Sequence, residues 1–128
     1  MINDSERPIL VAPMPTPFSL KDEVDLEAIE NNSIKWIDSE LSGFVLGTEN
    51  GEESLLNHNE KLDIFKTVSN VLKNKKLIIA GIDNPSISGT LKESEQYADM
   101  GADLIRIRIP RRRDTIDKYF DEVLKYIS

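Results

Sequence analysis

A loop bounded by two glycines is the segment of this sequence best suited to hold a small anion. It reads Gly47-Thr48-Glu49-Asn50-Gly51 and follows a short apolar run. Glycines let backbone N–H groups approach a ligand closely, and a threonine hydroxyl adds one more hydrogen-bond donor. The plainer interpretation is a turn in which the glycines only give the backbone its shape. We therefore take Gly47, Thr48, Asn50 and Gly51 as candidate binding residues and keep the turn as the alternative.

Two arginines near the end of the chain form a second candidate anion contact. Arg106 and Arg108 alternate with isoleucines, so we expect them on one face of a strand, where successive side chains point to opposite sides. Buried guanidinium groups need partners, which predicts either recognition of a carboxylate or phosphate, or ion pairs with nearby acids. The candidate acids are Glu49, Glu52 and Asp83. An exposed sheet face is the third interpretation.

The elements that position these residues are four short apolar runs, each followed by a helical pattern. The runs cover residues 9–12, 43–46, 77–81 and 104–109, and Pro or Gly ends them. They are nearly continuous in apolar residues, which is typical of parallel strands buried on both faces. The sequence thus predicts strands that begin near residues 9, 44, 77 and 104.

The helical patterns begin at residues that can cap a helix. Asp25, Asn57, Ser86 and Asp114 are the expected N-caps, and Glu60 completes a capping box with Asn57. The first helix is expected to carry its apolar positions as far as residue 41, and the third to stop at Gly101. The order strand-helix, repeated four times, predicts parallel βα units with right-handed crossovers.

These units fit two α/β architectures. Four parallel strands can form an open doubly wound sheet, or they can form the first half of a (β/α)8 barrel, which takes about 250 residues. The chain has 128 residues, about half of that length, and we expect residues 1–128 to form one partial barrel domain. In both architectures the function lies at the carboxyl ends of the strands, where the glycine loop falls.

Composition excludes several classes of function. The chain has 16 Lys and Arg against 23 Asp and Glu, a net charge of −7, which argues against binding nucleic acid through its overall field. It has no cysteine and one histidine, His58, so thiolate zinc sites and sites that need two histidines are excluded. We expect no metal and no membrane span. The acidic N-terminal stretch is unlike a signal peptide, which predicts a cytoplasmic protein.

Five short motifs resemble one known family. They are residues 12–18, which contain Thr16-Pro17-Phe18, then the Gly-Thr loop, then Glu60 downstream, Ala80-Gly81 at a strand end, and Gly101-Ala102-Asp103 before a strand that runs to Pro110. In this order and spacing they resemble the dihydrodipicolinate synthase / N-acetylneuraminate lyase family. The resemblance covers residues 9–110.

The resemblance implies a (β/α)8 barrel and an aldol cleavage or condensation of pyruvate-type 2-keto acids, without a cofactor. In that family a lysine on the sixth strand forms a Schiff base, a tyrosine on the fifth relays a proton, and the Gly-Thr loop holds the substrate carboxylate. Thr48 matches the first threonine of the loop, whereas Glu49 or Asn50 stands at the second. Because the 128 residues supply only the first four predicted strands, we expect no catalytic residue within the chain.

Three functional hypotheses stay open. The chain is part of a Schiff-base aldolase or lyase whose remainder lies elsewhere, or a catalytically incomplete half-barrel that binds a small anion or a partner chain, or an unrelated open-sheet protein. A half-barrel leaves two sheet edges free, which predicts an oligomer or a complementary C-terminal half. Arg106 and Arg108 on the inner face disfavour a tight symmetric dimer, because two copies bring four guanidinium groups together.

Overall fold

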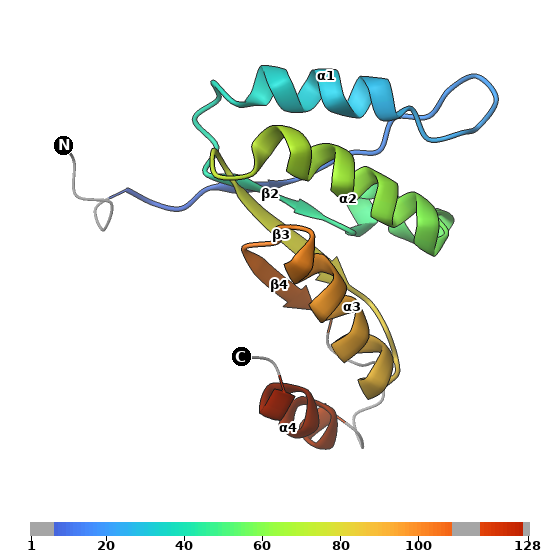
Figure 1. The fold of residues 1–128 in the computed structure, drawn as a ribbon, viewed down its shortest axis with the longest axis vertical. Helices are drawn as coiled ribbons and strands as arrows, with labels where there is room; N and C mark the ends of the chain where they lie inside the picture. Colours follow the sequence, from blue (N-terminus) through green and yellow to red (C-terminus); the bar gives the residue numbers. More distant parts are fainter. Residues whose placement is uncertain (1–6, 109–115, 127–128) are drawn as a thin grey trace.

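A computed structural model describes residues 7–108 and 116–126 of the chain, in which strands and helices alternate (Figure 1). The strands are β1 (Val11–Pro13), β2 (Gly43–Leu46), β3 (Leu77–Ile82) and β4 (Leu104–Ile107). The helices are α1 (Leu26–Trp36), α2 (His58–Leu72), α3 (Ile87–Asp99) and α4 (Ile116–Tyr126). All neighbouring strands pair in parallel, in the order β1-β2-β3-β4. The predicted series of four βα units is confirmed.

The helix starts follow from local capping. The Asp25 carboxylate accepts a hydrogen bond from the Ala28 N–H at 2.9 Å, and Asn57 and Glu60 form both bonds of a capping box. The Ser86 hydroxyl accepts from the Gly89 N–H at 2.8 Å. Each bond satisfies an N–H that the first helical turn leaves without a partner, which confirms these three caps. The predicted cap Asp114 lies outside the described residues.

Several element boundaries differ from the prediction. Helix α1 ends at Trp36 and does not reach residue 41, although Ile37 and Leu41 still pack against the core. Apolar residues in a loop can pack against the core as residues in a helix do, so the apolar pattern did not show where the helix ends. Strand β1 begins at Val11, not at residue 9, and β4 ends at Ile107.

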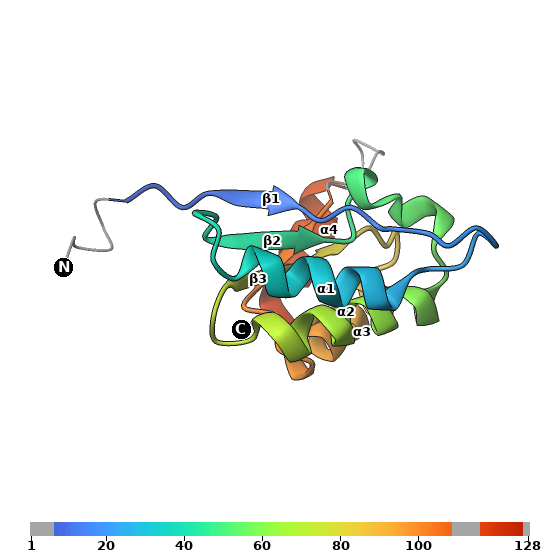
Figure 2. The ribbon, with the colours of Figure 1, turned by 90° about the horizontal axis from the view of Figure 1, so that it is seen from above.

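The core lies between one face of the sheet and helices α1, α2 and α3 (Figure 2). Phe44 of β2 and Ile78 of β3 are paired neighbours, and both point into this core. Trp36, the last residue of α1, stacks on Phe44 with ring centroids 5.2 Å apart. The fully buried Val68 and Leu72 belong to the apolar stripe of α2. These contacts fix the strands, and therefore fix where their carboxyl ends lie.

The opposite face of the sheet is open in the described residues. Along β3, buried residues alternate with half-buried ones, and along β4 the residues alternate between exposed and half-buried. Leu104 is 54% exposed and Val11 is 39% exposed. In the described residues the prediction of strands buried on both faces is therefore wrong for β3 and β4, because helices cover only one side. In a closed barrel this open face would be the inner one.

None of the helices in residues 7–108 and 116–126 combines the length and apolar character needed to cross a membrane.

Candidate functional site

The Gly-Thr loop leaves the carboxyl end of β2 through a glycine with a left-handed backbone. Gly47 has φ +71°, and a Cβ added to it would lie 2.6 Å from the carbonyl oxygen of Gly81, at the end of β3. Only glycine fits such a conformation and such an approach without strain. The two strand ends, with Gly47 and Gly81, are therefore held in direct backbone contact, and the loop starts from a fixed position.

Thr48 is the buried hydroxyl of the loop. Its residue is 8% exposed, and its backbone carbonyl accepts hydrogen bonds from the N–H groups of Gly51 and Glu53. Its side-chain Oγ1 is fully covered and has no hydrogen-bond partner within the described residues. A buried hydroxyl without a partner costs about 1–3 kcal/mol. The Thr48 hydroxyl at the end of β2 is therefore able to form a further hydrogen bond.

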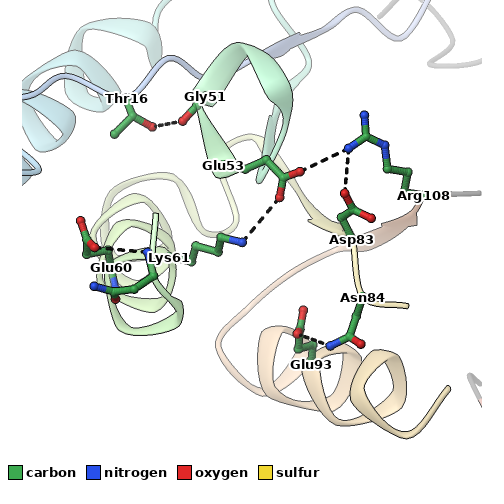
Figure 3. A network of polar contacts seen from close by, with 10 residues as sticks. Thr16, Gly51, Glu53, Glu60, Lys61, Asp83, Asn84, Glu93 and Arg108 are labelled. Carbon is green, nitrogen blue, oxygen red and sulfur yellow. Dashed lines mark hydrogen bonds and ion pairs between the residues drawn. The ribbon is translucent and has the colours of Figure 1, made fainter. Parts of the chain in front are cut away.

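The second glycine of the loop is held against the segment that follows β1. A Cβ on Gly51 would lie 2.8 Å from the carbonyl oxygen of Met14, and the Thr16 hydroxyl donates to the Gly51 carbonyl at 2.6 Å (Figure 3). Thr16 is thus a positioning residue for the loop. After Gly51, Glu52 takes a left-handed conformation with φ 56°, and this turns the chain from one 3-10 turn (Glu49–Gly51) into the next (Glu53–Leu55).

The four predicted loop residues do not share one environment. Thr48 and Gly51 are buried, Gly47 is half-buried, and Asn50 is exposed within the first 3-10 turn. The structure thus brings Gly47, Thr48 and Gly51 into one compact turn at the carboxyl ends of β2 and β3. Asn50 lies on the outside of that turn.

Arg108 lies just after β4 and is surrounded by acids. Its guanidinium is 2.7 Å from Asp83 and 3.5 Å from Glu53, and it also pairs with Glu49 (Figure 3 shows the first two). The hydrogen bond that it donates to Asp83, followed by the one to Glu49, raises the pKa of Arg108 above its usual value. Of the interpretations offered by the sequence, ion pairing describes Arg108. Glu52, the third expected partner, is not in the cluster; its neighbour Glu53 takes that place.

Glu53 is a site residue that the sequence did not single out. It is 6% exposed, and its carboxylate lies between Lys61 of α2 and Arg108, at 3.5 Å from each (Figure 3). A buried carboxylate needs such partners. The only signal for it was a second glutamate after Gly51, which does not distinguish the buried residue from the exposed one. The cluster as described holds three carboxylates against two cations, Lys61 and Arg108.

Arg106 differs from Arg108. It pairs in register with Gly81 of β3 and is exposed, on the face of the sheet that carries no helices. The two arginines are two positions apart along the strand direction, so strand alternation puts them on the same face, as expected. Their environments differ because the acids gather only at the strand ends, where Arg108 lies. Anion recognition by Arg106 stays a prediction.

A small cavity lies behind the Gly-Thr loop, on the helix side of the sheet. It measures about 20 Å³, and its lining includes Thr16, Gly47, Lys61 and Tyr97. That volume holds about one water molecule. Burial, and then the negative charges of Glu93 and Glu53, raise the pKa of Tyr97 to about 12. The cavity is too small for a substrate molecule.

Comparison with known proteins shows consistent similarity to one group of enzymes. The chain is 26% identical over 102 residues to the 4-hydroxy-tetrahydrodipicolinate synthase of Lactobacillus helveticus, an alignment that covers 79% of this chain and 33% of that protein. It superposes on a crystal structure of a dihydrodipicolinate synthase with a TM-score of 0.83 and 28% identity, covering 94% of this chain and 43% of that one. The chain therefore spans about a third of the length of the curated relatives it matches.

A second branch of enzymes shares the fold. An N-acetylneuraminate lyase from Mycoplasma synoviae superposes with a TM-score of 0.78 at 20% identity, covering 91% of this chain and 43% of that one. At this identity the likeness shows the fold alone: four βα units arranged as in the first half of a (β/α)8 barrel. The sequence model of the dihydrodipicolinate synthetase family matches residues 7–125. The chain belongs to the dihydrodipicolinate synthetase family.

Proposed function

We propose that this chain supplies the loop that binds the carboxylate of a 2-keto acid such as pyruvate, within a barrel of the Schiff-base aldolase and lyase type. The observation that carries the proposal is Thr48, whose hydroxyl is buried without a partner at the carboxyl end of β2 within the described residues. In barrels of this kind the active site lies at that end of the strands. A ligand carboxylate would satisfy the hydroxyl and remove the cost of leaving it unpaired.

The charge balance around the loop supports this assignment. Glu49 directly follows Thr48, and a free glutamate there would repel a carboxylate ligand. Its ion pair with Arg108 offsets that charge and holds the side chain toward the end of β4. Because Thr48 Oγ1 is covered by the chain's own atoms, the 3-10 turn must shift slightly to admit a ligand. The hydrogen bond that the Thr48 hydroxyl would gain from the ligand favours that shift.

The chain by itself is proposed to bind a keto acid without forming an imine. None of the four described strands contains a lysine. Exposed lysines have pKa values near 10.4 and stay protonated at neutral pH, so they are poor nucleophiles toward a ketone. Catalysis through a Schiff base therefore requires a lysine on a strand from outside these residues. The alternative function is a catalytically incomplete half-barrel that binds small anions, and the absence of a lysine from the four described strands is compatible with both.

The test is a calorimetric titration of the 128-residue chain with pyruvate. Thr48→Val keeps the shape of the side chain and removes the hydroxyl. We expect it to weaken pyruvate binding by about tenfold or more, since hydrogen bonds to charged groups contribute about 1.5–3 kcal/mol. Thr67→Val is the matched control, because the Thr67 hydroxyl bonds to the Asp63 carbonyl within α2, away from the loop. Equal binding by Thr48→Val and the parent, or no binding by the parent, would contradict the proposal.

Two further measurements separate the proposed function from its alternative. Inorganic phosphate that competes equally with pyruvate would identify a general anion site. Treatment with pyruvate and borohydride should leave the mass of the chain unchanged. A stoichiometric mass increase at one lysine would return the catalytic step to this chain and overturn the incomplete-site interpretation.

A further inference from the structure

The segment that enters β1 is an exposed apolar edge. Ile9 is 71% exposed, Leu10 is 53% exposed and Val11 is 39% exposed, and the segment runs as an extended arm past the sheet (Figure 2). Within the described residues β1 pairs with β2 alone, so its other side has no partner strand. Apolar edge strands with free backbone groups readily pair with another strand.

The other edge of the sheet carries a matching groove. It has a volume of about 980 Å³ and lies beside β4, between α3 and the last described residue of α4, Tyr126. The apolar residues that line it are Leu91, Ala98, Ala102, Leu104, Ile105 and Tyr126. Helix α4 uses Tyr119 and Val123 for packing, whereas Leu124 and Tyr126 are 65% and 67% exposed. The groove therefore lies between the edge of β4 and helix α3, with Tyr126 at its border.

We propose that the β1 segment of a second copy of this chain occupies the groove beside β4, and that the exchange is reciprocal. All four described strands are parallel, so β1 and β4 run in the same direction. A two-fold axis along the strands keeps that direction and sets each β1 beside the other copy's β4. Two copies then close a ring of eight parallel strands with no free edge. This arrangement does not depend on the ligand proposed above.

Charge complementarity favours this occupant and this direction. Asp99 ends α3 and Asp103 precedes β4, so both acids lie at the amino end of the groove, and the rim as a whole carries three acids, with Glu95, against one base, Lys92. Arg7 precedes β1. In a parallel pairing Arg7 arrives at the end where Asp99 and Asp103 lie. An antiparallel pairing would take it to the opposite end.

The sequence suggested that the arginines of the inner face would repel each other in a symmetric dimer, and the structure reduces this repulsion. Arg108 is held by three acids of its own chain, so two copies bring together only the two Arg106 side chains and not four free guanidinium groups. The cluster around Arg108 has one carboxylate in excess of its cations. That excess offsets the charge of Arg106, which lies two residues earlier on the same face.

The first test is the mass of the 128-residue chain by light scattering at micromolar concentration, where we expect a dimer. Arg7→Glu should raise the dissociation constant about tenfold or more. The double variant Arg7→Glu/Asp99→Lys should restore the parent value, because the exchanged charges again meet in the parallel arrangement. Lys35→Glu, a reversal at an exposed residue of α1, is the matched control and should leave the dimer unchanged. Circular dichroism checks that each variant folds.

The second test uses the lack of cysteine in the chain. Ile9→Cys mixed with Leu104→Cys should give a crosslinked dimer with a short bis-maleimide. Leu20→Cys mixed with Leu104→Cys should not, although Leu20 is fully exposed. A monodisperse monomer overturns the proposal. A dimer that resists Arg7→Glu and crosslinks no better through Ile9 than through Leu20 overturns this arrangement.

Discussion

The guanidinium of Arg108 lies 2.7 Å from the carboxylate of Asp83, so an ion pair joins the end of β4 to the end of β3. The same guanidinium reaches Glu49 and Glu53, which follow β2. One side chain therefore ties three strand ends together at the place where the Gly-Thr loop lies. In this chain Arg108 acts as a positioning residue for the loop, and the acids leave little of its charge for a ligand.

Arg108→Met should lower the midpoint of urea unfolding, because it leaves the buried carboxylate of Glu53 with only Lys61 as a partner among the described residues. The difference in urea midpoint between the parent and the variant should become smaller in high salt, since salt screens the exposed ion pairs. Lys125→Met is the matched control: it removes the surface pair with Glu122, which contributes little. Equal midpoints for Arg108→Met and the parent would show that the cluster does not hold the strand ends.

Thr90→Val should loosen α4 from α3. The Thr90 hydroxyl is fully buried and lies 2.6 Å from the Tyr119 hydroxyl, which itself donates to the Asn84 carbonyl at 3.2 Å. Losing this buried bond should cost about 1–2 kcal/mol of unfolding free energy. Hydrogen exchange should become faster in α4 than in α2. Faster exchange throughout the chain would instead indicate a general loss of stability.

The chain should lose stability in alkaline solution through Tyr97. Burial raises the pKa of Tyr97 to about 12, above its usual value near 10, so the folded state favours the neutral phenol. This contribution is complete below about pH 10 and is lost as the pH rises from about 10 through 12. Urea midpoints across that range should fall for the parent and fall less for Tyr97→Phe. Tyr126→Phe removes an exposed phenol and should keep the parent's decline.

Lys76→Met should destabilise the turn between α1 and β2. The Lys76 ammonium donates to the carbonyls of Ser39 and Leu41 at 2.7 and 2.6 Å. Losing these bonds should lower the free energy of unfolding by about 1 kcal/mol or more. Lys75→Met, at the exposed neighbouring position, should change it by less than about 0.5 kcal/mol. A similar loss in both variants would assign the effect to net charge rather than to the turn.

The helix starts and the order of elements could be predicted from the sequence alone. The side chains of Asp25, Asn57 and Ser86 each accept a hydrogen bond from the N–H group three residues later. Both partners of each cap are therefore close in the sequence. The strands were found for a similar reason: short β-branched runs that end at Gly or Pro have few other stable conformations. Strand β2 and the starts of β3 and β4 match their predicted residues, and the other strand boundaries shift by one or two positions.

The environment of the candidate site was decided by the tertiary structure. Arg108 meets Asp83 from 25 positions away, Glu53 from 55 and Glu49 from 59, so their pairing depends on how the strand ends come together. The sequence offered ligand binding and ion pairing for Arg108 as alternatives because both need the same guanidinium. It could not separate the buried Glu53 from the exposed Glu52, since a left-handed residue between two 3-10 turns decides which carboxylate faces inward.

Burial on one face only also came from the tertiary structure. A barrel strand has apolar side chains on both faces, because helices cover its outer face and other side chains fill the inside of the barrel. Its sequence is the same whether or not the inner face is covered. The sequence of β3 therefore predicted burial on both faces, while helices cover only the side of Ile78, Ala80 and Ile82. Local hydrogen bonds fix the elements within a few residues. What covers the open face depends on contacts between elements, which the local sequence does not fix.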